Sequence, residues 1–154
     1  MSLDQRCREL EREVKALVYE RLQDTRRMHD AHKACIEHAL RRGDAAVDMA
    51  GYRCDHLILA TLDALHRLDL GAADALLTEW EAAAQARMDQ QLFDQPQSGL
   101  LRMVRMPNGA LETKVEGGTD CVTVAVGERM MEDRAALREF RGLVETVVMV
   151  KAWI

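Results

Sequence analysis

The sequence predicts an α+β protein, in which a long antiparallel helical hairpin and a third helix precede a small, mainly antiparallel sheet with one short helix. Residues 1–42 contain neither glycine nor proline and repeat apolar residues at helical spacing, and Ser2 can cap their start. Residues 95–99 form a breaker cluster, after which the pattern alternates with a period of two. A helical region, 1–94, and a β-rich region, 95–154, are therefore expected to share one core.

Each remaining helix of the first region has its own boundary signals. Gly43 ends the first helix, and Asp44 is a candidate N-cap for a second helix over residues 45–69. Gly71 would end the second helix, and a third is predicted over residues 73–93. Because the link between the first two helices is so short, they are expected to lie antiparallel.

A β-hairpin is predicted at the start of the second region. Residues 100–106 and 110–116 read as strands, and they flank a Pro-Asn-Gly turn at residues 107–109. Asn-Gly favours a two-residue hairpin turn, because both residues tolerate positive φ. This turn would place Arg105 opposite Glu112, so that opposite charges pair across the ladder.

The rest of the second region is predicted to complete the sheet. Residues 121–126 form an apolar, β-branched strand, and residues 132–140 form a short helix. Residues 144–151 are also rich in β-branched side chains and are assigned to a strand. A helix remains the alternative there, because the apolar residues within 137–148 also fit one helix face.

A layer of histidine and cysteine is expected inside the helical hairpin. His29, His32 and Cys35 follow one another at three-residue intervals, and folding at the glycine brings His32 level with Cys54 and Asp55. Thiolate and imidazole ligands suit zinc, so the candidate metal site consists of His29, His32, Cys35 and Cys54. The alternative, which we favour, is a core layer without a cofactor, because the chain has no His-x-x-x-His chelating pair.

The four cysteines favour a reducing compartment. Cys7, Cys35, Cys54 and Cys121 are far apart, form no Cys-x-x-Cys motif and follow no export signal. No apolar run is long enough for a transmembrane helix. We therefore expect a cytoplasmic protein that does not span a membrane.

Catalytic motifs are missing from the sequence. There is no Gly-x-Ser-x-Gly, no phosphate-binding glycine loop and no His-Glu-x-x-His. The only serines are Ser2 and Ser98, and neither has the context of a nucleophile. We therefore predict that the protein is not an enzyme.

Charge is distributed unevenly along the chain, whose net charge is −5. Residues 1–43 carry a net charge of +2 and residues 95–154 a net charge of 0, whereas residues 44–94 carry −7. A negative chain with six aromatic residues is a poor candidate for direct nucleic-acid binding. The long helices also do not fit a winged helix-turn-helix.

An acidic ridge with apolar neighbours is predicted along the second helix. Its members, the candidate partner-binding residues, are Asp44, Asp48, Tyr52, Asp55, Leu59 and Asp69. Such a ridge would steer a basic partner and then bury apolar surface against it. The partner would be another protein, for example one that handles nucleic acid. The alternative is a solvated helix face.

These features together predict a non-enzymatic interaction protein. Its size and acidity resemble those of small phage or mobile-element proteins that block bacterial defence complexes, anti-CRISPR proteins among them. They are also similar to those of acidic secretion chaperones, and no motif connects the chain to either group. The resemblance implies an inhibitor or regulator, with a metal-binding sensor or enzyme as the alternative. The overhang of a 42-residue helix also makes a homodimer an option.

Overall fold

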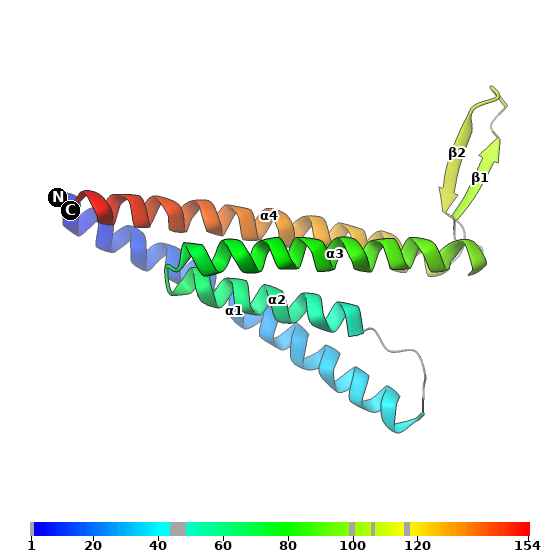
Figure 1. Cartoon of the computed structure of the whole chain (residues 1–154), viewed down its shortest axis with the longest axis horizontal. Helices are drawn as coiled ribbons and strands as arrows, with labels where there is room; N and C mark the ends of the chain where they lie inside the picture. Colours follow the sequence, from blue (N-terminus) through cyan, green and yellow to red (C-terminus); the bar gives the residue numbers. More distant parts are fainter. Residues whose placement is uncertain (1, 44–48, 99–100, 106, 116–117) are drawn as a thin grey trace.

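Four helices and one β-hairpin account for the part of the chain that the structure describes (Figure 1). The computed structural model describes residues 2–43, 49–98, 101–105, 107–115 and 118–154. In order along the chain, the elements are α1 (Leu3–Arg41), α2 (Met49–His66), α3 (Leu70–Ser98), β1 (Leu101–Arg105), β2 (Leu111–Val115) and α4 (Gly118–Trp153). The termini lie side by side at the end of the bundle opposite the hairpin (Figure 1).

The predicted α+β fold class is wrong, because the protein is helical. The predicted strands at 121–126 and 144–151 and the short helix at 132–140 all belong to the 36-residue helix α4. Only the hairpin of β1 and β2 forms a sheet among the described residues. The helix that was the alternative for residues 144–151 is the correct interpretation, because the apolar residues within 137–148 lie along one buried side of α4. Those with relative exposures of 1% or less are Leu137, Val144 and Val147.

The first helical hairpin matches the prediction. α1 and α2 lie side by side and antiparallel (Figure 1). Ser2 caps α1, its Oγ accepting a hydrogen bond from the backbone N–H of Gln5 at 3.1 Å. Gly43 follows α1 with a φ of +77°, the left-handed conformation that glycine adopts without a steric penalty.

The turn between α2 and α3 occurs earlier than predicted. α2 ends at His66, and Leu68 adopts a φ of 60°, so the chain reverses before it reaches Gly71. The carboxylate of Asp69 then caps α3 by accepting a hydrogen bond from the backbone N–H of Ala72 at 3.1 Å. Gly71 lies in the first turn of α3. The Asp69 cap thus starts α3 near the position where Gly71 was expected to end the second helix.

The hairpin has a different register from the predicted one. Arg105 pairs with Leu111, and Val104 pairs with Glu112, one residue away from the expected pairing. Asn108 and Gly109 still form the turn: the Asn108 side chain accepts a hydrogen bond from Ala110 N–H, and Gly109 has a φ of +83°. The register differs because the loop that follows the last pair, Arg105 with Leu111, is five residues long, whereas the predicted turn was two residues long.

The core runs through the middle of the four-helix bundle. α1 packs against α2 and α4, α3 packs against the same two helices, and α2 also contacts α4. Trp80 on α3 is the largest fully buried side chain, with a relative exposure of 1%. None of the helices, over the residues described, has a stretch long and apolar enough to cross a bilayer.

Candidate functional site

Two buried carboxylates connect three helices near the middle of the bundle. Asp55 on α2 and Asp133 on α4 have relative exposures of 7% and 8%. Arg129 on α4 donates to Asp55 Oδ1 at 3.3 Å and lies 3.7 Å from Asp133 Oδ2. Arg21 on α1 donates to Asp133 Oδ1 at 2.8 Å. Two arginines thus compensate two buried acids, as buried charges require.

Burial dominates the ionisation of Asp133. It raises the pKa of this carboxyl above the ordinary value, because the charged form loses hydration, while Arg129 and Arg21 act in the opposite direction. A cavity of about 420 Å³ opens beside the pair of arginines. Its charged lining is balanced between Arg21, Arg27 and Arg129 and the acids Asp24, Glu132 and Asp133. This balance gives the cavity no preference for an anion or a cation.

Histidines and a tyrosine lie next to the buried acids. His32 Nδ1 is 3.4 Å from Asp55 Oδ2, so the two residues are level, as the sequence predicted. His29 is buried and stacks on Tyr52 with ring centroids 4.3 Å apart, and the ring of His56 lies 5.8 Å from it. Burial lowers the pKa of His29, although the Asp55 charge opposes this. His29 is therefore held neutral inside the bundle.

The four predicted metal ligands do not form one site. His29 is buried and His32 is half-buried on α1, and Cys54 is buried on α2. Cys35, however, is exposed. Over the described ranges, no three histidine, cysteine, aspartate or glutamate side chains are grouped so that they could hold a metal ion. The geometry therefore offers no support for zinc.

The predicted acidic ridge is also not assembled on one exposed face. Asp44 and Asp48 lie outside the described residues. Asp55 points inward to Arg129, which sequence reasoning could not foresee because residue 129 was not assigned to any helix. Asp69 is exposed but serves as the cap of α3.

The apolar neighbours of the ridge contribute to packing. Tyr52 is half-buried beside His29, and Leu59 is half-buried against the core. The side of α2 that was expected to face a partner therefore faces the other helices in part. α2 also packs against α3, and the two helices, within residues 49–98, form one layer of the bundle.

The acids of α3 form ion pairs with arginines of its neighbours α2 and α4. Asp74 accepts hydrogen bonds from both ends of the Arg141 guanidinium at 2.9 and 3.1 Å, which lowers the pKa of Asp74. Glu79 pairs with Arg53 of α2 at 3.3 Å, and Glu81 lies within 3.8 Å of two arginines of α4. Arginines of α2 and α4 thus partly offset the negative charge of this layer.

An apolar groove of about 510 Å³ runs between α2 and α3. Alanines make its floor, namely Ala50, Ala82, Ala83 and Ala86. Its rim is polar and contains Arg53, Glu79, Arg87 and Gln90. The groove exists because small side chains on both helices leave room where larger ones would fill it. Sequence reasoning missed it, although the Ala-rich run of α3 was visible as a signal.

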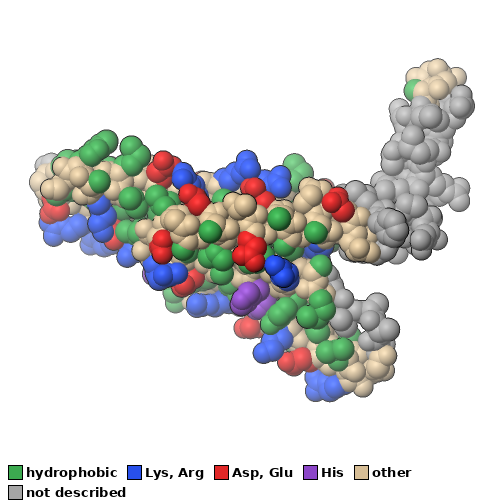
Figure 2. All heavy atoms as spheres, viewed as in Figure 1, with side chains coloured by type: hydrophobic (Ala, Val, Ile, Leu, Met, Phe, Trp, Pro, Cys, Tyr) green, Lys and Arg blue, Asp and Glu red, His purple; other side chains and the backbone are tan. Residues whose placement is uncertain are grey.

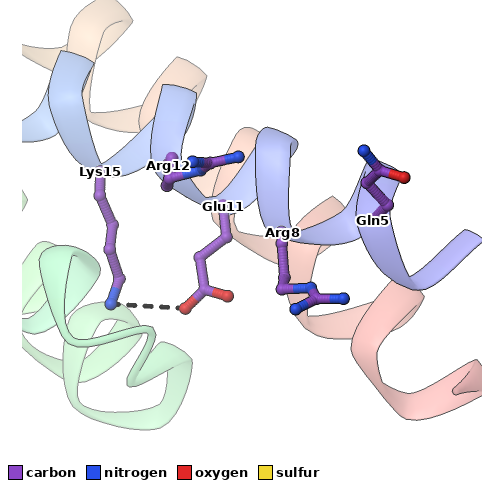
Figure 3. A pocket seen from close by; sticks show the side chains of 5 residues that line it. All are labelled: Gln5, Arg8, Glu11, Arg12 and Lys15. Atoms are coloured by element: carbon purple, nitrogen blue, oxygen red, sulfur yellow. Dashed lines mark ion pairs between the residues drawn. The ribbon is translucent and has the colours of Figure 1, made fainter.

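A second surface hollow, of about 540 Å³, lies on the first turns of α1 (Figure 3). It is lined by Gln5, Arg8, Glu11, Arg12 and Lys15. Burial raises the pKa of Glu11, but hydrogen bonds and charge from Lys151 and Lys15 outweigh it and lower the pKa. The hollow is thus basic, and its one carboxylate is already shared by two lysines at 3.2 and 3.4 Å.

No protein-family model matches the sequence, and neither a curated protein nor a solved structure matches it. The groove between α2 and α3 is the hollow that combines an apolar floor with a charged rim, the combination typical of a site that recognises another protein's side chains.

Proposed function

We propose that the protein is a non-enzymatic interaction module, an inhibitor or regulator that binds a basic surface of another protein. The contact surface in this proposal is the groove between α2 and α3. One observation carries the proposal: an apolar groove lies in the segment, residues 44–94, that holds a net charge of −7, and Glu79 is the acid on its rim, beside Arg53 and Arg87. Basic residues of a partner would be steered there and an apolar side chain would occupy the alanine floor.

At the rim of the groove, an ion pair within the chain can be exchanged for one with a partner. Arg53 and Glu79 face each other at 3.3 Å across α2 and α3, and their side chains are 65% and 52% exposed. Exposed pairs of this kind contribute little to stability, so a partner's lysine or arginine can replace Arg53 at low cost. A partner approaching this rim would therefore gain a charge contact without unfolding any element.

Proteins that handle nucleic acid are the partners that fit this surface best. Such proteins carry lysine and arginine where they contact phosphates, and an acidic module would compete for that surface. We place this activity in the cytoplasm, where an exposed thiol such as Cys35 stays reduced. Regulation by occupying a basic surface needs no catalytic residue and no cofactor.

The test is affinity capture from the source cell with mass spectrometry, followed by binding of the purified partner at rising salt. Ala86→Trp fills the groove from an exposed position, and Glu79→Lys replaces the acid of its rim by a base. We expect both variants to lose a partner that wild type retains, and the binding to weaken as salt rises.

Asp63→Lys is the matched control, because Asp63 is an exposed acid of α2 that pairs locally with Arg67, just beyond the end of the helix. It should bind like wild type. Equal capture by wild type and both groove variants would remove the groove from the proposal, and a partner without a basic surface would remove the electrostatic argument.

A further inference from the structure

The outward face of α4 carries a row of exposed uncharged residues, which Arg138 and Glu139 interrupt between Ala135 and Gly142. Residues three and four positions apart share one side of a helix, and on this side six uncharged residues are all exposed. They are Met131, Ala135, Gly142, Thr146, Met149 and Trp153, which we call the α4 stripe. The relative exposures of its three large side chains are 72% for Met131, 48% for Met149 and 69% for Trp153. Figure 2 shows hydrophobic side chains along the C-terminal part of α4.

Gly142 is the residue that the fold of one chain does not explain. It lies inside a 36-residue helix, where glycine is the least favourable residue after proline. A Cβ atom at this position would meet no atom within 4 Å, so no neighbour in the chain requires a glycine. An outward glycine in a long helix instead permits the close approach of another backbone.

We propose that the α4 stripe is a homodimer interface, in which α4 of two copies crosses antiparallel at Gly142. Reversing one copy about Gly142 places Met149 over Ala135, a large side chain over a small one. The same operation places Trp153 over Met131, and a thioether packs favourably against an aromatic ring. A parallel arrangement would instead set each large residue against its own copy.

Charges beside the stripe favour a second copy over a different partner. Arg138 and Glu145 lie four and three residues from Gly142 in opposite directions, and by helical geometry about 40° and 60° to the same side of it. A two-fold axis at Gly142 therefore brings Arg138 of each copy beside Glu145 of the other. Their side chains are 63% and 43% exposed, and each already forms an ion pair within its own chain, Arg138 with Glu81 and Glu145 with Arg141, which the pair across the axis would replace or share. The surface is thus complementary to itself in charge as well as in size.

Sedimentation equilibrium of the full chain tests the interface. Wild type is expected to form a dimer, and Gly142→Leu to weaken association at least about tenfold, because its side chain separates the helices at their crossing. The monomer accommodates that side chain, since the space outside Gly142 is open. Circular dichroism should show unchanged helix content.

Exchange of the charge pair tests the antiparallel register. Arg138→Glu and Glu145→Arg should each weaken the dimer, whereas the double variant should regain most of the wild-type affinity. Arg67→Glu, the same charge change on an exposed residue of the turn between α2 and α3, is the control and should leave the dimer intact. A monomeric wild type, a dimer that Gly142→Leu does not affect, or a double variant without recovery would each overturn the proposal. The proposal is independent of the groove between α2 and α3.

Discussion

At the scale of single residues, His29 has the clearest consequence for solution behaviour. Its side chain is buried, and its Nδ1 has no hydrogen-bond partner in the structure. Because burial lowers the pKa of His29, this residue binds a proton less readily in the folded protein than in the unfolded chain. The unfolded state then binds more protons, so the contribution of His29 to stability falls as pH drops from the ordinary histidine pKa towards the lowered one. Asp133, with its raised pKa, acts in the opposite sense at lower pH.

The prediction is that His29→Phe makes stability less sensitive to acid. Urea unfolding at about pH 7.5 and about pH 5.5 spans the ordinary histidine pKa. We expect the free energy of unfolding of wild type to drop between these values, and the drop to be smaller in His29→Phe. His38→Phe, the same change at an exposed histidine, should leave the drop unchanged. Equal drops in wild type and His29→Phe would mean that His29 is not held neutral.

The contacts around the buried carboxylate of Asp55 were only partly predictable from the sequence. Folding the sequence at Gly43 was enough to bring His32 level with Asp55, because two antiparallel helices have a simple register. The burial of Asp55 was not predictable, since the residue that compensates it is Arg129 of α4. A carboxylate at the border of an apolar stripe faces solvent or the core depending on the third helix that packs there.

At the scale of elements, α4 shows why local preference misled the prediction. Its sequence contains two runs of β-branched residues, which favour strands. The free energy gained from that preference is smaller than the free energy gained by burying a whole helix face. The 3.6-residue spacing of Leu137, Val144 and Val147 was the decisive signal, because all three are buried on one side. The first helix was easier, because its propensity, its cap and its apolar period all agreed.

Replacement of Gly127 by alanine distinguishes a continuous helix from a strand end. A Cβ at Gly127 would lie 3.7 Å from Met88 Cε, an ordinary contact. Within a helix, Gly127→Ala should raise the free energy of unfolding by about 1 kcal/mol. Urea denaturation measures the change, and Gly109→Ala, at a φ of +83°, should instead destabilise the hairpin turn. No gain at Gly127 would contradict a helix through residue 127.

The β-hairpin was predictable in place but not in register. Asn-Gly located the turn, since Asn108 and Gly109 adopt it whatever the pairing. The exact register depends on how many residues the loop contains, and a shift of one residue exchanges the two faces of each strand. Among the described residues, no third strand lies beside the hairpin to constrain the register further.

At the scale of the whole molecule, the buried carboxylates hold α1, α2 and α4 together. Removal of Asp55 would leave Arg129 and His32 without their shared acceptor. We expect Asp55→Ala to lower the free energy of unfolding by about 2 kcal/mol, the cost of uncompensated polar groups in a partly buried site. Asp63→Ala removes an exposed acid that pairs locally with Arg67, and should cost less than about 0.5 kcal/mol. Equal losses in a urea titration would show that the cluster contributes no more than a surface pair.

The side-by-side placement of the two chain ends has a practical consequence (Figure 1). A bulky fusion at either terminus stands next to the last turn of α4, where Trp153 is exposed, and would shield that turn from a second molecule. Tags for biophysical work are therefore best kept short and cleaved. Immobilising the protein by one of its ends, conversely, directs the opposite end of the bundle towards solution, which suits surface-based binding assays.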